Sequence, residues 1–379
     1  MNVLLNFFPV QSGGGQQVAS NFLKIIASNG FGHNWFVFVG KNSELHKQSE
    51  ELFKKTSILS MHYSYMARIL NKKTIQQFIN DNSIDIVYNY APVLSIENVP
   101  QVVRTVYSNL YFPEIDFWKD YSQKTRLKKK IIDHFRLKGT LKADGLIFEN
   151  KSMQERVQTL FNYDLNKTLY VEPSVTLFDE KKENKYYEFL RTEKAFKILY
   201  LSSWHLNKNI HLLPEIAKVL KEMDVSVKFI LSLDKVNPDI QKYLIQPIVS
   251  LNVEEYFEFI GKVESVYVHQ VIKNCDAMIL LSKLECFSSN IIEAFYFKKP
   301  LIISDEPWAY SECKDAVLYV SRDNVKDIAD KIQKLILDFN LSNQLVNRGN
   351  ERLVQFNSPT EKVAKQIYFL EKILKEFKE

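Results

Sequence analysis

The stretch Leu281-Ser-Lys-Leu-Glu-Cys-Phe-Ser-Ser-Asn-Ile-Ile-Glu-Ala-Phe-Tyr-Phe-Lys-Lys-Pro300 decides how this chain folds. It lies between two short apolar runs, Ala277–Leu281 and Pro300–Ser304, whose lengths suit buried strands of a parallel sheet. We expect a loop and then a helix from Ser289 or Asn290, which makes a strand–loop–helix–strand unit. The carboxyl end of such a strand, beside a helix N-terminus, is where open α/β sheets bind ligands and where a phosphate is favoured.

Two acidic side chains flank this loop, Glu285 within it and Glu293 on the following helix. Carboxylates on both sides of a phosphate can accept hydrogen bonds from hydroxyl groups, and a nucleotide-sugar offers hydroxyls on its sugar and on its ribose. Two alternatives stay open at this point. Asn290 and Glu293 also fit a capping box, and Glu285 fits a solvated loop acid.

The segment from Cys275 to Asp305 resembles the signature of the retaining GT-B glycosyltransferases of family 4. The shared features are Ser-x-x-Glu-x-Phe after a buried strand, a second Glu, then Ala and Lys-Pro before another strand. In this chain they are Ser282, Glu285, Phe287, Glu293, Ala294, Lys299 and Pro300.

The resemblance implies roles for the residues of this loop. Glu285 would contact the donor sugar and Glu293 its ribose, and the donor site would include Phe287, Ser288 and Ser289. The glycines that usually flank the Phe are Cys286 and Ser288 here, and Lys298 replaces the glycine before Lys-Pro, so the backbone of the loop is less free.

The length and composition are those of an ordinary globular protein. A chain of 379 residues is long enough for two domains, and 46% hydrophobic with 25% charged residues argues against disorder. No apolar run approaches the roughly 20 residues that span a bilayer, and the N-terminus does not resemble a signal peptide. The three cysteines have no CxxC spacing, so we expect neither a disulfide framework nor a zinc site. The compartment that this cysteine usage favours is a reducing cytoplasm.

Basic residues concentrate in residues 119–142, where they alternate with apolar ones. A basic amphipathic helix of this kind can lie on an anionic membrane surface, and a solvated helix face is the alternative. We expect no nucleic-acid partner, because no nucleic-acid-binding module accompanies these charges.

The chain begins with a predicted strand, Asn2–Phe8, then a glycine loop and a helix over Val18–Ala27, which is how a doubly wound domain starts. Glycines allow close approach of a ligand, although a tight turn is the commoner explanation for them. Family 4 enzymes are similar here, which implies that the backbone of Gly14 and Gly15 faces the donor diphosphate.

Further strands are predicted at 34–39, 84–90, 101–106, 143–149 and 169–171, with helices at 74–80 and 152–161. Many family members have a His after the 101–106 strand, but Tyr107, Ser108 and Asn109 stand here. Asn109 is our candidate for a hydrogen bond to the donor sugar, with a turn residue as the alternative. A charged stretch from Asp179 to Lys185 suits a linker.

The second domain starts with a strand over 196–201 and a loop ending in Lys208 and Asn209, which resembles the family's Gly-Arg…Lys-Asn loop. The resemblance implies that Lys208 grips the donor diphosphate, with Ser203 in the position of the arginine and His205 assisting. A turn after Gly261 places Val263 near the nucleobase by the same resemblance.

The remaining elements complete this domain. We expect strands at 227–232, 256–263 and 316–320, helices at 266–273 and 325–339, and an irregular loop at 305–310. A last helix at 361–378 crosses back to the first domain in the GT-B fold.

The sequence therefore predicts an α/β protein of GT-B type, with two facing Rossmann-like domains. Residues 1–175 with 360–379 form the acceptor-side domain, and 176–359 the nucleotide-sugar domain. The predicted activity is retaining, metal-independent hexosyl transfer from a nucleotide-diphosphate sugar to a glycan or lipid-linked acceptor, in bacterial-type surface polysaccharide, lipopolysaccharide or glycolipid synthesis. Glu285, Lys208 and Asn109 are the catalytic candidates, with no metal and no cofactor.

Two alternatives remain: a non-catalytic GT-B subunit that partners an active enzyme, and a sugar-nucleotide epimerase. The expected location is the cytoplasm, peripherally on the inner face of the membrane.

Overall fold

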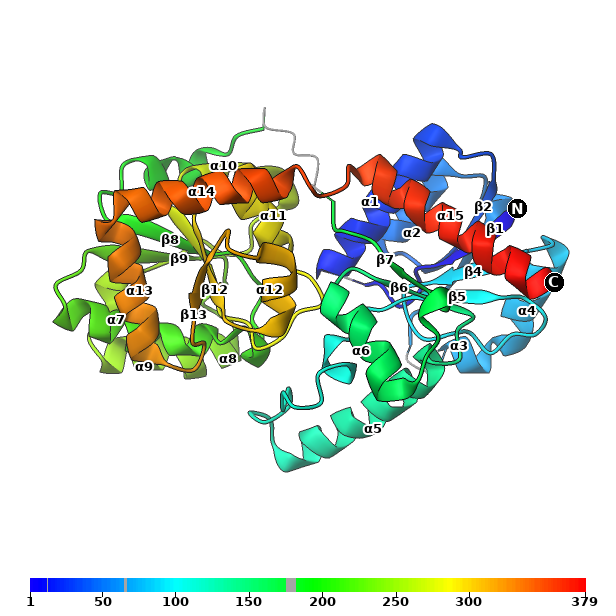
Figure 1. Ribbon diagram of the computed structural model, residues 1–379, viewed down its shortest axis with the longest axis horizontal. Coiled ribbons are helices and arrows are strands. Elements are labelled where there is room, and N and C mark those ends of the chain that lie inside the picture. Colours follow the sequence, from blue (N-terminus) through cyan, green and yellow to red (C-terminus); the bar gives the residue numbers. More distant parts are fainter. Residues whose placement is uncertain (12, 65–66, 175–181) are drawn as a thin grey trace. The chain divides into compact units, whose positions relative to one another are not determined.

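The structure is a computed structural model that describes residues 1–11, 13–64, 67–174 and 182–379. The chain divides into two compact units: unit 1 comprises Met1–Ser174 with Asn357–Glu379, and unit 2 comprises Val175–Phe356. Each unit is built on one parallel β-sheet with helices packed against it (Figure 1). The predicted α/β class with two Rossmann-like sheets is confirmed.

Among the described residues of unit 1, seven strands form a sheet in the order β3-β2-β1-β4-β5-β6-β7. They are β1 (Asn2–Asn6), β2 (Asn34–Gly40), β3 (Ile58–Met61), β4 (Ile86–Asn89), β5 (Gln101–Arg104), β6 (Gly145–Phe148) and β7 (Thr168–Tyr170). The strands are apolar because both faces are covered: Val3 and Leu5 join one core cluster and Leu4 joins another. The strand order reverses between β1 and β4, so their carboxyl ends form a topological switch point.

The helices of unit 1 lie against this sheet. They are α1 (Gly13–Asn29), α2 (Glu44–Leu52), α3 (Ala67–Leu70), α4 (Lys72–Asp81), α5 (Gln123–Thr140), α6 (Lys151–Phe161) and α15 (Pro359–Lys378), with short 3₁₀ turns η1 (Lys55–Ser57), η2 (Ser108–Leu110) and η3 (Leu165–Lys167).

The first helix corrects a prediction. We expected a glycine loop and a helix from Val18, but α1 begins at Gly13, so Gly14 and Gly15 belong to its first turn. Glycine is a poor helix former, which is why the sequence indicated a loop. The first turn of a helix has backbone N–H groups without intrahelical partners, so these glycines still present donors to an anion.

The last helix, α15, belongs to unit 1 although unit 2 precedes it in the chain, as predicted. It contacts α1 and β4 (Figure 1), and its apolar face joins the core of unit 1 through residues such as Ile367, Leu370 and Ile373. A capping box of Ser358 and Glu361 starts the helix.

A buried ion triad ties α15 to the sheet of unit 1. Glu149, directly after β6, accepts bonds from Arg104 Nε at 3.1 Å and Nη2 at 2.6 Å, and from Lys362 Nζ at 2.6 Å. Burial would raise the pKa of the Glu149 carboxyl, but the two cations outweigh it and lower the pKa to about 2. The carboxylate therefore stays ionised and holds both cations in place.

Among the described residues of unit 2, six strands form a sheet in the order β10-β9-β8-β11-β12-β13. They are β8 (Phe196–Tyr200), β9 (Val227–Leu231), β10 (Phe257–Phe259), β11 (Ala277–Leu280), β12 (Leu301–Ser304) and β13 (Leu318–Val320). The helices are α7 (Leu213–Glu222), α8 (Pro238–Ile240), α9 (Gln246–Ser250), α10 (Val268–Lys273), α11 (Ser289–Tyr296), α12 (Pro307–Cys313), α13 (Val325–Leu337) and α14 (Phe339–Leu353). Short helical turns are η4 (Lys185–Arg191), η5 (Leu206–Lys208), η6 (Ile210–Leu212), η7 (Gln241–Ile245), η8 (Glu254–Tyr256) and η9 (Ser265–Tyr267).

Two predictions for unit 2 were wrong. The irregular loop expected at 305–310 is largely α12, because Pro307 stands in the first turn, where proline favours a helix. The helix expected at 325–339 ends at Leu337, and Asp338 caps a separate helix, α14, which the sequence analysis did not predict. The predicted linker 179–185 lies partly outside the described residues.

Candidate functional site

The candidate site of unit 2 lies where β8 and β11 end side by side. The two strands pair in parallel, with Ala277 opposite Ile198 and Met278 opposite Leu199. From β8 the chain continues to β9 and β10 on one side of the sheet, and β11 starts the other side. The strand order therefore reverses between β8 and β11, which is the topological switch point where doubly wound sheets bind ligands.

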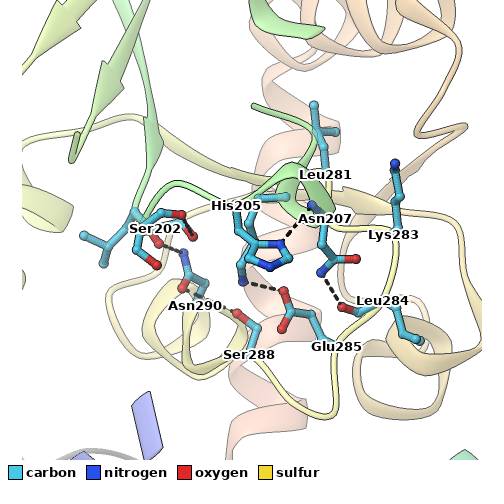
Figure 2. Close-up of polar contacts among 12 residues, drawn as sticks. Ser202, His205, Asn207, Leu281, Lys283, Leu284, Glu285, Ser288 and Asn290 are labelled. Carbon is cyan, nitrogen blue, oxygen red and sulfur yellow. Dashed lines mark hydrogen bonds and ion pairs between the residues drawn. The ribbon is translucent and has the colours of Figure 1, made fainter. Parts of the chain in front are cut away.

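The loops after these strands, 201–209 and 281–288, are joined by hydrogen bonds (Figure 2). The Asn207 amide nitrogen donates to the Leu284 carbonyl at 2.8 Å, and the Lys283 N–H donates to the Asn207 carbonyl at 2.8 Å. Asn290 on α11 donates to the Leu201 carbonyl at 2.9 Å. Each bond satisfies a buried polar group, so the loops form one rigid unit.

Tyr200, the last residue of β8, connects the same two loops through its side chain. Its buried hydroxyl donates to the Lys208 carbonyl and accepts from the Leu281 N–H at 3.2 Å. Burial raises the pKa of this phenol well above its ordinary value, so it stays protonated and keeps donating. The backbone of Lys208 is thereby anchored to the strand that precedes it.

The predicted site residues Lys208 and Glu285 form an ion pair across the two loops. Their side chains are only 20% and 14% exposed, so water screens the pair weakly. The resemblance assigned Lys208 to the diphosphate and Glu285 to the sugar, yet here each satisfies the other. A diphosphate can replace the carboxylate as the partner of Lys208, and Glu285 would then be available to a sugar hydroxyl.

Glu293 lies on α11 and is 8% exposed. Its Oε2 is buried and has no hydrogen-bond partner among the described residues. Burial raises the pKa of this carboxyl to about 7, and a hydrogen bond with the Ser289 side chain acts in the opposite direction. A buried carboxyl oxygen without a donor is costly, which is typical of a group that acquires its partner from a ligand.

The capping-box alternative for Glu293 is not realised. The helix α11 has Ser288 as its N-cap and begins at Ser289, so Asn290 lies inside the helix. The side chain of Asn290 is instead directed to the Leu201 carbonyl. Glu293 is consequently not part of a capping box, the structural role that its spacing from Asn290 also allowed.

Other predicted donor residues of unit 2 lie in the 201–209 loop and at the start of α11. His205 accepts the Asn207 N–H on its Nδ1 at 3.1 Å, and Ser203 is exposed beside it. Ser288 is buried with its hydroxyl 3.4 Å from Asn290 Oδ1, while Ser289 is exposed at the start of α11.

Two further candidates, Phe287 and Val263, are half-buried. Phe287 lies in the 281–288 loop, and Val263 lies in the loop that follows β10.

The remaining candidates belong to unit 1. Gly14 and Gly15 belong to the first turn of α1, which follows β1 at the switch point of the unit 1 sheet. Asn109 lies in η2, where its amide nitrogen donates to Asp133 Oδ2 at 2.7 Å. The donor group of Asn109 is thus bound to α5, and its carbonyl oxygen is the part left for a ligand.

Sequence reasoning missed Asn207 and Tyr200, which position the Lys208–Glu285 pair. Asn207 is 5% exposed, and its partner Leu284 stands 77 residues further along the chain. No local pattern marks such a contact. The only available signal was an asparagine within a loop between a strand and a helix, which a turn also explains.

The described residues contain no group of three or more His, Cys, Asp or Glu side chains arranged to hold a metal ion. Within the same residues, no helix combines the length and apolarity that crossing a membrane requires.

Residues 181–352 match the family model of the glycosyl transferases group 1, and the segment includes the 201–209 and 281–288 loops. No curated protein matches the chain.

Several solved structures share the fold of the whole chain. A glycosyltransferase from Rickettsia africae ESF-5 has a TM-score of 0.72 at 16% identity, covering 99% of this chain and 98% of that one. Anabaena Alr3699/HepE, in complex with UDP and glucose, has a TM-score of 0.69 at 16% identity, covering 98% and 100%. WaaG, a glycosyltransferase involved in lipopolysaccharide biosynthesis, has a TM-score of 0.69 at 11% identity, covering 98% and 99%. At these identities the likeness establishes the GT-B fold.

Proposed function

We propose that this GT-B chain, whose unit 2 carries the group 1 glycosyl transferase match, is a retaining glycosyltransferase of family 4. It moves a hexose-type sugar from a nucleotide-diphosphate donor to a glycan or lipid-linked acceptor. The observation that carries the proposal is the Lys208–Glu285 ion pair beside the switch point between β8 and β11. Glu285 lies on the loop that leads into α11, where Oε2 of the buried Glu293 carboxyl has no hydrogen-bond partner among the described residues.

Donor binding exchanges partners within the site. The diphosphate takes the place of Glu285 on the Lys208 ammonium and accepts N–H bonds from the start of α11 at Ser289. Glu285 then accepts a hydroxyl of the sugar, and Glu293 Oε2 accepts a hydroxyl of the ribose. These contacts use the two charges that otherwise neutralise each other and a Glu293 oxygen that has no partner among the described residues.

The transfer step breaks the bond between the anomeric carbon and the diphosphate oxygen and forms one to the acceptor oxygen. The acceptor hydroxyl proton passes to the departing phosphate oxygen, so the charges balance. Lys208 and the α11 N-terminus stabilise the negative charge of the leaving group. Departure and attack on the same sugar face retain the configuration, and the step involves no metal ion.

The other candidates have supporting roles in this proposal. For Gly14, Gly15 and Asn109, which belong to unit 1, the donor-side roles implied by the family resemblance stay predictions. His205 and Ser203 border the phosphates, and Phe287 and Ser288 shape the loop. Val263 contacts the nucleobase.

The fold relatives support a proposal for the biological setting. Alr3699/HepE was solved with UDP-glucose, and WaaG takes part in lipopolysaccharide biosynthesis. We therefore propose that this enzyme acts in surface polysaccharide, lipopolysaccharide or glycolipid synthesis, on the cytoplasmic side of the membrane, with a uridine diphosphate sugar as the first donor to test.

A calorimetric screen of uridine-, guanosine- and thymidine-diphosphate sugars against the full chain tests the proposal. One donor should bind at micromolar to millimolar Kd, and with acceptor extracts it should release its nucleoside diphosphate. Binding without release or hydrolysis would instead indicate a non-catalytic GT-B subunit. Conversion of the sugar without an acceptor would indicate an epimerase, and no binding at all would refute a nucleotide-sugar site.

A further inference from the structure

The helix α5 (Gln123–Thr140) carries an exposed apolar stripe. Leu127, Ile131 and Phe135 are 65%, 51% and 63% exposed. They are four residues apart, so they lie along one face of the helix. Large apolar side chains in a contiguous exposed row are unusual on a soluble surface and indicate a surface that becomes covered.

Exposed lysines border this stripe. Lys124 and Lys138 stand near its two ends, and Lys128 and Lys130 lie on its two sides, as the 100° step per residue of a helix requires. None of the four has an ion pair among the described residues, and all four are exposed. The stripe and its border therefore present positive charge that the rest of the described chain does not neutralise.

The opposite face of α5 uses its charges within unit 1. Its acidic residue, Asp133, is buried and accepts hydrogen bonds from Trp118 Nε1 at 2.7 Å and from Arg136 Nη1 at 3.1 Å. Arg126 pairs with Asp116 at 2.6 Å, and Lys129 lies 4.9 Å from the Trp118 ring centroid. The inner cations are thus neutralised or stacked, and they hold the helix so that the apolar stripe faces outward.

We propose that the outer face of α5 docks on an anionic lipid bilayer. The apolar stripe enters the boundary between headgroups and acyl chains, and the four lysines contact lipid phosphates around it. An anionic bilayer suits the lysines and the apolar stripe together, because its headgroup surface is negatively charged and its interior is apolar. The proposal stands apart from the proposed function, since vesicle binding requires neither donor nor acceptor.

Flotation of the full chain with vesicles tests the docking surface. At low ionic strength the protein should bind vesicles of phosphatidylglycerol and phosphatidylcholine, and it should stay free with phosphatidylcholine alone. Each lysine near an anionic surface contributes about fivefold in partitioning. Replacing Lys124, Lys128, Lys130 and Lys138 by Gln should therefore weaken partitioning by at least about a hundredfold. The triple change Leu127→Ser, Ile131→Ser and Phe135→Ser should weaken it by at least about tenfold.

Matched controls separate this face from general charge and hydrophobicity. Lys41, Lys47, Lys54 and Lys55 are also exposed, and their replacement by Gln removes the same net charge from unit 1. Leu337, Phe339 and Val354 are 76%, 76% and 84% exposed, and they give a triple Ser variant of similar apolar loss. Both controls should bind vesicles within about threefold of the wild type, because a threefold change is less than the effect of a single lysine at the surface.

A fluorescence reporter measures insertion directly. The emission of the Phe135→Trp variant should shift to shorter wavelength on anionic vesicles and be quenched by brominated lipid, whereas Phe339→Trp should show neither change. The proposal is overturned if the wild type fails to bind anionic vesicles at low salt. It is equally overturned if the control variants lose as much binding as the α5 variants, or if the tryptophan introduced by Phe135→Trp stays unquenched on bound vesicles.

Discussion

At the scale of single residues, Glu293 combines a buried carboxyl with an oxygen that has no hydrogen-bond partner in the described part of the chain. Its pKa is raised to about 7, and the unfolded chain returns it to its ordinary value of 4.5. Between those two values the folded protein holds a proton that the unfolded chain has released. Stability therefore falls as the pH rises through this window, by about 3 kcal/mol at most.

Glu293→Gln should remove this pH dependence. The variant should gain stability over the wild type at pH 8 but not at pH 4, because glutamine carries no charge to desolvate. Urea unfolding at both pH values, followed by the fluorescence of Trp204 and Trp308, measures the difference. The exposed Glu351→Gln variant is the control and should follow the wild type. Equal slopes for Glu293→Gln and the wild type would contradict the burial argument.

The Lys208–Glu285 pair predicts opposite effects of its two halves on nucleotide binding. Glu285→Gln removes the carboxylate that competes with phosphate for Lys208, so UDP alone should bind more tightly, by about threefold to tenfold, while sugar transfer slows by at least about a hundredfold. Lys208→Met should weaken UDP binding by at least about tenfold, because it removes the cation. Calorimetry with UDP and a radiolabelled transfer assay separate the two.

Weaker UDP binding by both variants would mean that Glu285 supports the fold of the loop rather than competing for Lys208. Thermal unfolding of each variant distinguishes that outcome, since a misfolded loop would also lower Tm.

At the scale of elements, the site depends on the bond between two loops that follow neighbouring strands. Asn207→Ala removes the donor to the Leu284 carbonyl and leaves a buried acceptor unsatisfied, which should cost about 1–3 kcal/mol. The loops would then be held less firmly, although the Lys283 N–H bond to the Asn207 carbonyl and the Lys208–Glu285 pair remain, so the KM for the donor should rise more than kcat falls. Chemical unfolding and steady-state kinetics measure the two effects, with the exposed Asn343→Ala as the matched control.

Elements were well predicted where their pattern is local. The buried strands β8, β11 and β12, and the start of α11 at Ser289, follow from short apolar runs and their flanking residues. The helices α12 and α14 were missed, since Pro307 suggested a loop and no cap was recognised at Asp338. Both errors arise at helix starts, where one residue type fits a turn and a cap equally well.

At the scale of the whole molecule, the Glu149 triad holds the C-terminal helix on unit 1. The pKa of Glu149 is lowered to about 2, so its contribution to stability is present above the ordinary value of 4.5 and is lost as the pH falls towards 2. Glu149→Gln should leave Arg104 and Lys362 buried without a counter-charge and cost about 3–5 kcal/mol. Lys362→Met should cost less, because Arg104 and Glu149 stay paired.

Unfolding of unit 1 can be followed through Trp35 and Trp118. The Glu149→Gln variant should be destabilised at pH 7 and should change less than the wild type between pH 4.5 and 2.5. A larger cost for Lys362→Met than for Glu149→Gln would show that packing of the lysine stem, rather than charge, holds α15.

The sequence alone determined the alternation of buried strands with helices, the doubly wound class, and the loops that carry Lys208, Glu285 and Glu293. These features depend on short windows, because strand length, apolar runs and helix starts are set by neighbouring residues. Only the tertiary structure decided that Lys208 and Glu285 satisfy each other and that Asn109 is bound to Asp133. It also decided that Glu293 is buried with one oxygen that no described residue hydrogen-bonds. The physical reason is that pairing and burial depend on which strands lie side by side, and the partners Lys208 and Glu285 are 77 residues apart in the chain.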